Sequence, residues 1–194
     1  MVNRSGEFEQ FAPVNTGDFA ILRAGAQRLP SGLSCGKNAR VNFAENLNSI
    51  RERIAAACAR AGREPSSVTL LAVSKSHPPE TIRTAVAAGQ LLFGENKIQE
   101  AKAKIPLCPG RARWQFIGHL QSNKVRDAVA WFELIQGVDS LAIAEEISRR
   151  AVQAAKTMPI LLEVNVAGEG SKFGYRPEQL LKRGLNVVER WHQV

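Results

Sequence analysis

Short apolar runs alternate with helical stretches along most of the chain. The runs are rich in β-branched and aliphatic residues and cover residues 68–73, 91–93, 114–117, 134–138 and 160–166. Their first residues lie 20 to 26 positions apart, which is the length of one strand followed by one crossover helix. Consecutive units of this kind predict a parallel sheet of the α/β class, either closed into a barrel or doubly wound.

The stretches between the runs repeat apolar residues at helical spacing. They carry Ile82, Val86 and Ala87; Ile98 and Ala101; Val125, Val129 and Phe132; and Ile143, Ile147 and Val152. A further helix is predicted before the first run, from Phe43 to Cys58, with Gly62 as its C-cap. Helices are therefore expected between the strands and also ahead of them.

Residues 1–40 differ from the rest of the chain in composition and hydrophobic pattern. They mix Gly, Ser, Asn and Pro and show no sustained hydrophobic period, which is typical of a disordered arm. A transit peptide fits less well because the segment contains the acids Glu7, Glu9 and Asp18, and an extended gene-model start is a further alternative. We expect an arm over residues 1–40 and one domain over residues 41–194.

Polar residues follow every predicted strand. They are Ser74 and Lys75, Glu95 and Asn96, Gly118 and His119, Asp139 and Ser140, and Asn165. A (β/α)₈ barrel builds its site from many strand ends at one rim, whereas a doubly wound sheet binds at one switch point, usually marked by a Gly-rich turn. Neither G-x-G-x-x-G nor G-x-x-x-x-G-K-[ST] occurs. The predicted fold is therefore a TIM-type (β/α)₈ barrel, of which five βα units are present.

The composition is that of a globular protein, with 44% hydrophobic and 23% charged residues. No apolar run approaches the ~20 residues that span a bilayer, and no signal-peptide core follows the first residues. The three cysteines, Cys35, Cys58 and Cys108, are widely spaced and form no C-x-x-C motif. This spacing favours reduced thiols in the cytosol over disulfides or a zinc site, so we expect a cytoplasmic protein.

Lys and Arg outnumber Asp and Glu by 26 to 18, which gives a net charge of +8. Such a charge attracts phosphates and anionic surfaces. The basic residues are scattered, however, and aromatic residues do not alternate with them as they do in tracks that bind single-stranded nucleic acid. A solvated basic surface is therefore favoured over a specific nucleic-acid partner.

Lys75 is the first candidate for chemistry, because it follows a strand predicted to be buried on both faces. Burial lowers the pKa of an amine from its ordinary ~10.4, and the neutral nitrogen becomes a nucleophile toward a carbonyl. The alternative is a lysine whose stem passes the strand end to pair with a carboxylate. Glu95, after the next strand, either balances Lys75 or neutralises another nearby base.

Several motifs together resemble one known family. They are Ala72-Val73-Ser74-Lys75, Phe93-Gly94-Glu95-Asn96, Gln99-Glu100, Trp114-Gln115-Phe116-Ile117-Gly118-His119-Leu120-Gln121-Ser122-Asn123-Lys124 and Ser171-Lys172-Phe173-Gly174. In this order and spacing they resemble the pyridoxal phosphate homeostasis protein family, which is similar to the N-terminal barrel domain of bacterial alanine racemases. The resemblance covers residues 43–194.

The resemblance implies that Lys75 carries pyridoxal 5′-phosphate (PLP) as a Schiff base at the barrel mouth. It also implies cofactor-binding positions at Asn96 beside the ring, at His119 and Ser122 after the third strand, and at Lys172 after the fifth. Each of these has a structural alternative, which is helix capping for Asn96 and Ser122 and simple solvent exposure for His119 and Lys172.

The function implied is a PLP-binding protein of vitamin B6 homeostasis without established catalysis. One alternative is a racemase-like enzyme, which needs an opposing acid or base that similar proteins take from a separate β-domain. Another is an interaction protein, or a non-binding fragment, that meets partners through its basic surface. Because similar proteins hold the phosphate through their last three βα units, the resemblance also implies a truncated chain with weakened cofactor retention and self-association at open sheet edges.

Overall fold

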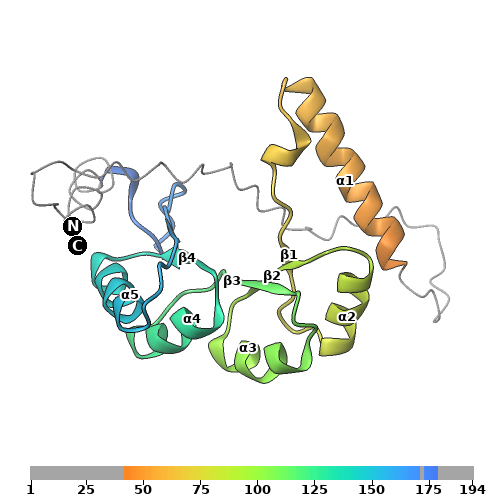
Figure 1. Cartoon of the computed structure of the whole chain (residues 1–194). Helices are drawn as coiled ribbons and strands as arrows, with labels where there is room; N and C mark the ends of the chain where they lie inside the picture. Colours follow the sequence, from red (N-terminus) through yellow and green to blue (C-terminus); the bar gives the residue numbers. More distant parts are fainter. Residues whose placement is uncertain (1–41, 171–172, 179–194) are drawn as a thin grey trace, which may run out of the picture. The chain divides into compact units, whose positions relative to one another are not determined.

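The computed structural model describes residues 42–170 and 173–178 (Figure 1). The contacts divide the chain into two compact units, one with residues 45–70 and the other with residues 42–44 and those from 71 onward. The predicted arm, residues 1–40, lies outside the described part. None of the described helices combines the length and the hydrophobicity that a membrane-spanning segment requires.

The smaller unit contains most of helix α1 (Phe43–Arg60) and the 3₁₀ turn η1 (Pro65–Ser67). Leu47 and Cys58 are the buried residues of α1. Beyond its end, Gly62 has a φ of 62°, a left-handed conformation in which glycine carries no side-chain penalty. The helix and its glycine stop signal are therefore as the sequence predicts.

The larger unit is built on a five-stranded sheet whose neighbours all pair in parallel. The strands are β1 (Ala72–Val73), β2 (Leu92–Glu95), β3 (Arg113–Phe116), β4 (Leu134–Val138) and β5 (Ile160–Leu162). Their order in the sheet is the order of the chain. A doubly wound sheet reverses direction at a switch point, so the sequential order confirms the barrel-type fold over the doubly wound alternative.

A helix follows each of the first four strands. These helices are α2 (Pro79–Ala87), α3 (Ile98–Lys104), α4 (Val125–Trp131) and α5 (Leu141–Gln153), with short 3₁₀ turns η2 (Ile105–Leu107) after α3 and η3 (Ser122–Lys124) before α4. Figure 1 shows α2 to α5 side by side along one side of the sheet. This one-sided layer is the outer helical layer of a barrel.

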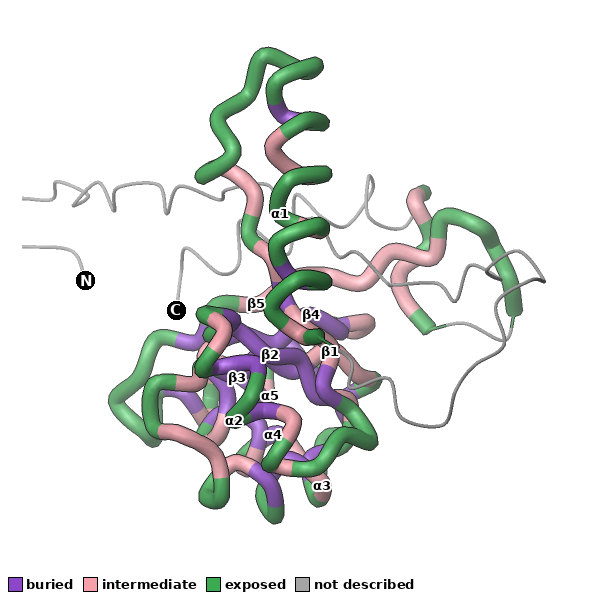
Figure 2. Tube along the Cα trace, turned by 90° about the vertical axis from the view of Figure 1, so that its right-hand side faces the viewer, coloured by how far each residue is buried: buried purple, intermediate pink, exposed green. Residues whose placement is uncertain are grey.

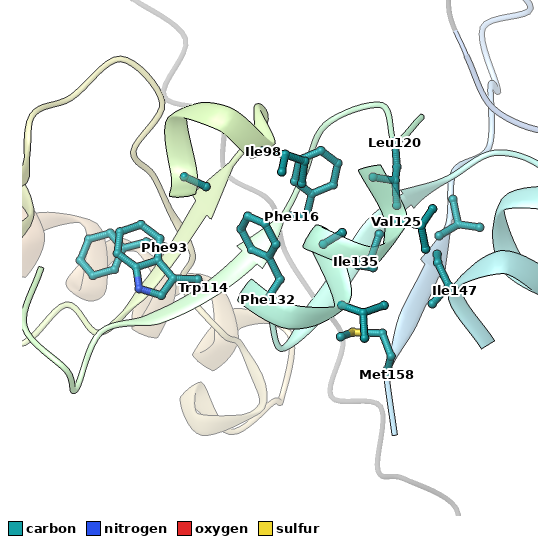
Figure 3. Close-up of a cluster of buried hydrophobic side chains, with 14 of the residues drawn as sticks. Phe93, Ile98, Trp114, Phe116, Leu120, Val125, Phe132, Ile135, Ile147 and Met158 are labelled. Carbon is teal, nitrogen blue, oxygen red and sulfur yellow. The ribbon is translucent and has the colours of Figure 1, made fainter. Parts of the chain in front are cut away.

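The core lies between this helical layer and the sheet. The rings of Phe93 and Trp114 are 5.3 Å apart, as are those of Phe116 and Phe132, in the contact distance of packed aromatic pairs. Figure 3 shows these rings with the neighbouring aliphatic side chains. Figure 2 shows that β2 and β4 are buried along their length, and β3 is buried after its first residue, Arg113.

The strand register separates the two faces of the sheet. Phe93 is level with Trp114, and Glu95 with Phe116, so these four side chains share the helix-facing side. Val73 is level with Gly94 and faces the opposite side. Since side chains alternate along a strand, Ser74 lies on the same face as Ala72 and turns toward the helices, where its Oγ contacts Glu95. Lys75 follows in a turn at the end of the strand.

Three details differ from the sequence prediction. Strand β1 is two residues long rather than six, because β2 begins only at Leu92 and offers residues 68–70 no ladder partner. Strand β5 ends at Leu162 rather than at residue 166. Val152 is 69% exposed, because the helical repeat from Ile147 falls on Ala151, which is buried in its place.

Candidate functional site

The carboxyl ends of the strands gather the candidate residues at one edge of the sheet. Lys75 follows β1, Asn96 follows β2, His119 follows β3 and Asp139 follows β4. Ladder hydrogen bonds continue past the strand ends, with the N–H of Ser74 donating to Gly94 O (3.0 Å) and that of Ile117 to Glu95 O (2.9 Å). The prediction that these positions share one rim is therefore confirmed.

The predicted desolvation of Lys75 is wrong. Its side chain is exposed, and the two residues of β1 are only half-buried because β1 is the edge strand of the described sheet. The alternative of a carboxylate partner is not observed either, since Lys75 forms no ion pair with any residue that the structure describes. The amine is thus presented to solvent at the rim.

Next to Lys75 lies a polar cluster made of the buried residues Ser74, Glu95 and Lys104 and the partly exposed Glu100. Lys104 Nζ donates to Glu95 Oε1 (2.7 Å), to Ser74 O (2.8 Å) and to Glu100 Oε1 (2.9 Å). Ser74 Oγ donates to the same Glu95 oxygen at 2.6 Å. The base that Glu95 neutralises is therefore Lys104 and not Lys75.

The contacts within the cluster shift the pKa values of Lys104 and Glu100. Burial by itself lowers the pKa of Lys104, but the hydrogen bonds from its ammonium to Glu95 and Glu100 outweigh burial and leave that pKa raised. The Lys104 ammonium in turn lowers the pKa of Glu100, with help from the Ser76 N–H. Both shifts favour the charged forms of Lys104 and Glu100.

Asn96 occupies the end of β2, half-buried and close to the neighbouring strand end. A Cβ on Gly118 would lie 2.9 Å from Asn96 Cα, so only a glycine permits this approach. The N-cap of α3 is Lys97, and no side chain caps the helix there, so the capping alternative for Asn96 is wrong. The Asn96 amide makes no side-chain hydrogen bond within the described residues.

A cleft of about 240 Å³ opens beside Asn96. It is lined by the start of α3 and by the segment after β3, namely Asn96, Lys97, Ile98, Gln99, Phe116, His119, Leu120, Gln121 and Lys124. The cleft brings Asn96 and His119 together. It does not include Lys75 or Ser122 in its lining.

His119 is held from two sides. Its Nδ1 lies 3.0 Å from Asp139 Oδ2, and its ring stacks on Phe173 with 3.8 Å between ring centres. The side chain is nevertheless 37% exposed, so His119 is a solvent-exposed loop histidine, as the alternative expects, with two neighbours in contact. Tyr175, two residues after Phe173, is half-buried, and burial, with a smaller effect from the Asp139 charge, raises the pKa of its phenol.

The two remaining candidates contribute less to the described site. Ser122 is exposed and begins η3, where no side chain forms a capping hydrogen bond, so its predicted capping role is wrong. Lys172 lies outside the described residues. No group of three or more His, Cys, Asp or Glu side chains in the described ranges is arranged to hold a metal ion.

Sequence reasoning missed Lys104, although one signal for it exists. The buried positions of α3 are Ile98, Ala101 and Lys104, so a lysine occupies the apolar face of a short amphipathic helix. A charge at such a position requires a buried partner. Glu100 lies one turn earlier on α3 and is within reach of Lys104 in the helix alone. Glu95, the fully buried partner, comes within reach only when β2 packs against the helix.

Comparison with known proteins identifies the family. The family described as "Alanine racemase, N-terminal domain" matches residues 46–191. A pyridoxal phosphate homeostasis protein of Pseudomonas aeruginosa is 44% identical over 139 residues, which are 71% of this chain and 60% of that protein. The corresponding protein of Escherichia coli is 38% identical over 152 residues, or 76% and 65% of the two chains.

Solved structures agree with this assignment. PipY of Synechococcus elongatus, solved without PLP, is 38% identical and superposes with a TM-score of 0.67 over 76% of this chain and 65% of its own. The PLP-bound form of PipY superposes with a TM-score of 0.63. The chain spans roughly 60 to 65% of the length of these relatives. It belongs to the alanine racemase N-terminal domain family.

Proposed function

We propose that this chain binds PLP covalently through Lys75 and serves vitamin B6 homeostasis in the cytosol. The observation that carries the proposal is the exposed Lys75 amine at the carboxyl edge of a parallel sheet, with its backbone anchored from behind. Relatives named for PLP homeostasis and a PLP-bound PipY structure support it. The two cysteines of the described part, Cys58 and Cys108, are free thiols, which suits a reducing compartment.

The residues at the rim fit the chemistry of PLP. The cofactor brings an aldehyde that accepts an amine, a ring with a phenolic oxygen and a phosphate, so it requires an accessible amine and neighbouring hydrogen-bond donors. Lys75 supplies the amine. Asn96, at the end of the adjacent strand, supplies an amide that is not hydrogen-bonded to any described residue. The cation at Lys104 is committed to carboxylates and does not compete with Lys75 for the aldehyde.

The test is covalent trapping at Lys75. The chain is incubated with PLP and reduced with borohydride, and the modified peptide is identified by mass spectrometry. We expect the adduct on Lys75 and its loss in Lys75→Ala. Lys102→Ala is the matched control, because Lys102 is an exposed lysine of α3 that pairs with Asp127 and is not at the rim.

Two outcomes decide the proposal. An adduct on Lys75 that survives in Lys102→Ala supports it. Labelling spread over several exposed lysines, with no preference for position 75, contradicts it, because nonspecific amines react with an aldehyde according to their exposure alone.

A further inference from the structure

The residues on either side of Lys75, Ser74 and Ser76, are both hydrogen-bonded to the same polar cluster. On one side, Ser74 is 3% exposed, and its carbonyl accepts a hydrogen bond from Lys104 Nζ at 2.8 Å. On the other side, the N–H of Ser76 donates to Glu100 Oε1 at 2.6 Å. That same Glu100 oxygen accepts a hydrogen bond from Lys104.

The hydrogen bond to Ser76 supports an unusual backbone conformation. Its φ is 63°, in the left-handed region that residues with a side chain seldom adopt. Such a conformation persists only where the surroundings fix it. The bond from its N–H to Glu100 fixes Ser76 from the side of α3, so the chain direction immediately after Lys75 depends on the position of Glu100.

Lys104 is the group that ties the cluster together. An ammonium has three donors, and all three are used, one on each of Glu95, Glu100 and the Ser74 carbonyl. Its side chain is 6% exposed and that of Glu95 is 0% exposed. Glu95 Oε2 has no hydrogen-bond partner in the described residues, so the buried Glu95 charge depends on Lys104 and Ser74 alone.

We propose that Lys104 is a positioning residue for Lys75: it fixes the backbone on both sides of Lys75, through the Ser74 carbonyl and through Glu100 to Ser76. Lys104 is buried at the end of α3, whereas Lys75 is exposed in the turn after β1. This inference rests on the proposed role of Lys75 in holding PLP. A fixed backbone presents the amine in one direction, which lowers the entropy lost when the cofactor is bound.

The first test compares Lys104→Met with Lys102→Met, a matched change two residues earlier on the same helix. Amide hydrogen exchange of the unliganded chain measures the Ser76 N–H, and spectroscopic titration measures PLP affinity. In Lys104→Met we expect Ser76 exchange to accelerate and PLP affinity to fall, each by about tenfold or more, because the freed loop samples many conformations. Lys102→Met should leave both unchanged.

Lys104→Met leaves the buried Glu95 carboxylate without its cation, so this variant can fail to fold. A second variant therefore separates a positioning role from a purely structural one. The double variant Glu95→Gln with Lys104→Met contains no buried charge at this site and retains an amide that accepts from Ser74 Oγ. A structural role predicts that it recovers both stability and PLP affinity. Positioning predicts that stability recovers while fast Ser76 exchange and weak PLP binding persist.

The outcomes distinguish this inference from the proposed function. Wild-type Ser76 protection and wild-type PLP affinity in a folded Lys104 variant overturn the positioning role and leave Lys75 as the PLP residue. Absence of PLP trapping at Lys75 in the unsubstituted chain overturns the proposed function, whereas the exchange at Ser76 still reports whether Lys104 fixes the loop. Glu100→Gln, at a position 27% exposed, adds an independent measure of the link to Ser76.

Discussion

At the scale of single residues, glycines set how closely the strand ends approach one another. A Cβ on Gly118 would collide with the backbone of Asn96, and a Cβ on Gly137 would collide with the carbonyl of Gly118. Both positions lie at the carboxyl side of the sheet, where the candidate residues gather. Because Gly118 has no side chain, the backbone of Asn96 can pack directly against the end of the neighbouring strand.

Gly118→Ala tests this packing. The new methyl meets backbone atoms of Asn96 that cannot rotate away, so we expect a loss of about 1–3 kcal/mol in the free energy of unfolding, typical of overpacking. Urea denaturation measures it. Gly110→Ala is the control, because nothing lies within 4 Å of a Cβ there, and it should change stability little. Equal effects of the two substitutions would contradict the close approach at Gly118.

At the scale of elements, the helices combine apolar faces with polar links between neighbours. Helix α3 meets α4 through an ion pair in which Lys102 Nζ lies 2.9 Å from Asp127 Oδ2. This hydrogen bond from Lys102 lowers the pKa of Asp127 below its ordinary value. The apolar faces locate the helices from sequence, but the ion pair depends on which turns of the two helices meet.

Asp127→Asn tests the link between α3 and α4. A carboxyl whose pKa is depressed by folding stabilises the protein above its unfolded pKa and loses that contribution as the pH falls through the folded pKa. The pair is partly exposed, so we expect a loss of about 0.2–1 kcal/mol at neutral pH. The difference from the unsubstituted chain should shrink as the pH falls below 3.8, the ordinary pKa of this carboxyl, toward its lower pKa in the folded chain. Unfolding curves over this range measure it, and a difference independent of pH would indicate a packing effect instead.

At the scale of the larger unit, the position of each strand in the sheet determines how strongly it resists local unfolding. Strands β2, β3 and β4 each have a neighbour on both sides, whereas β1 and β5 lie at the edges of the described sheet. The central strands are almost wholly buried, while the residues of β1 and β5 are half-buried. Local opening therefore begins at the edges.

Amide hydrogen exchange tests this ranking. The Ile117 N–H, bonded to Glu95 O between β3 and β2, should exchange about tenfold or more slowly than the Glu163 N–H, bonded to Val138 O beside β5. Both bonds are 2.9 Å long, so the difference reports the position in the sheet and not the hydrogen-bond length. Equal rates would mean that the sheet opens only as one cooperative unit.

The amino-acid pattern was enough to predict the alternation of strands and helices, the barrel-type class and the polar residues that follow the strands. These follow from periodicity and from the polar residues after each strand, which are local properties of the chain. The length of β1 was predicted poorly, because a strand extends only where its neighbour offers a partner. Val152 was assigned to the wrong face, because hydrophobicity outweighed the small Ala151 in the pattern.

The surroundings of the candidate residues depend on contacts that form when the chain folds. Lys104 and Ser74 are 30 positions apart in the chain, and their contact exists because parallel pairing brings the ends of β1 and β2 beside α3. The exposure of Lys75 and the Asp139 partner of His119 were fixed in the same way. Burial and charge pairing depend on which distant atoms meet, and no local pattern in the chain encodes those meetings.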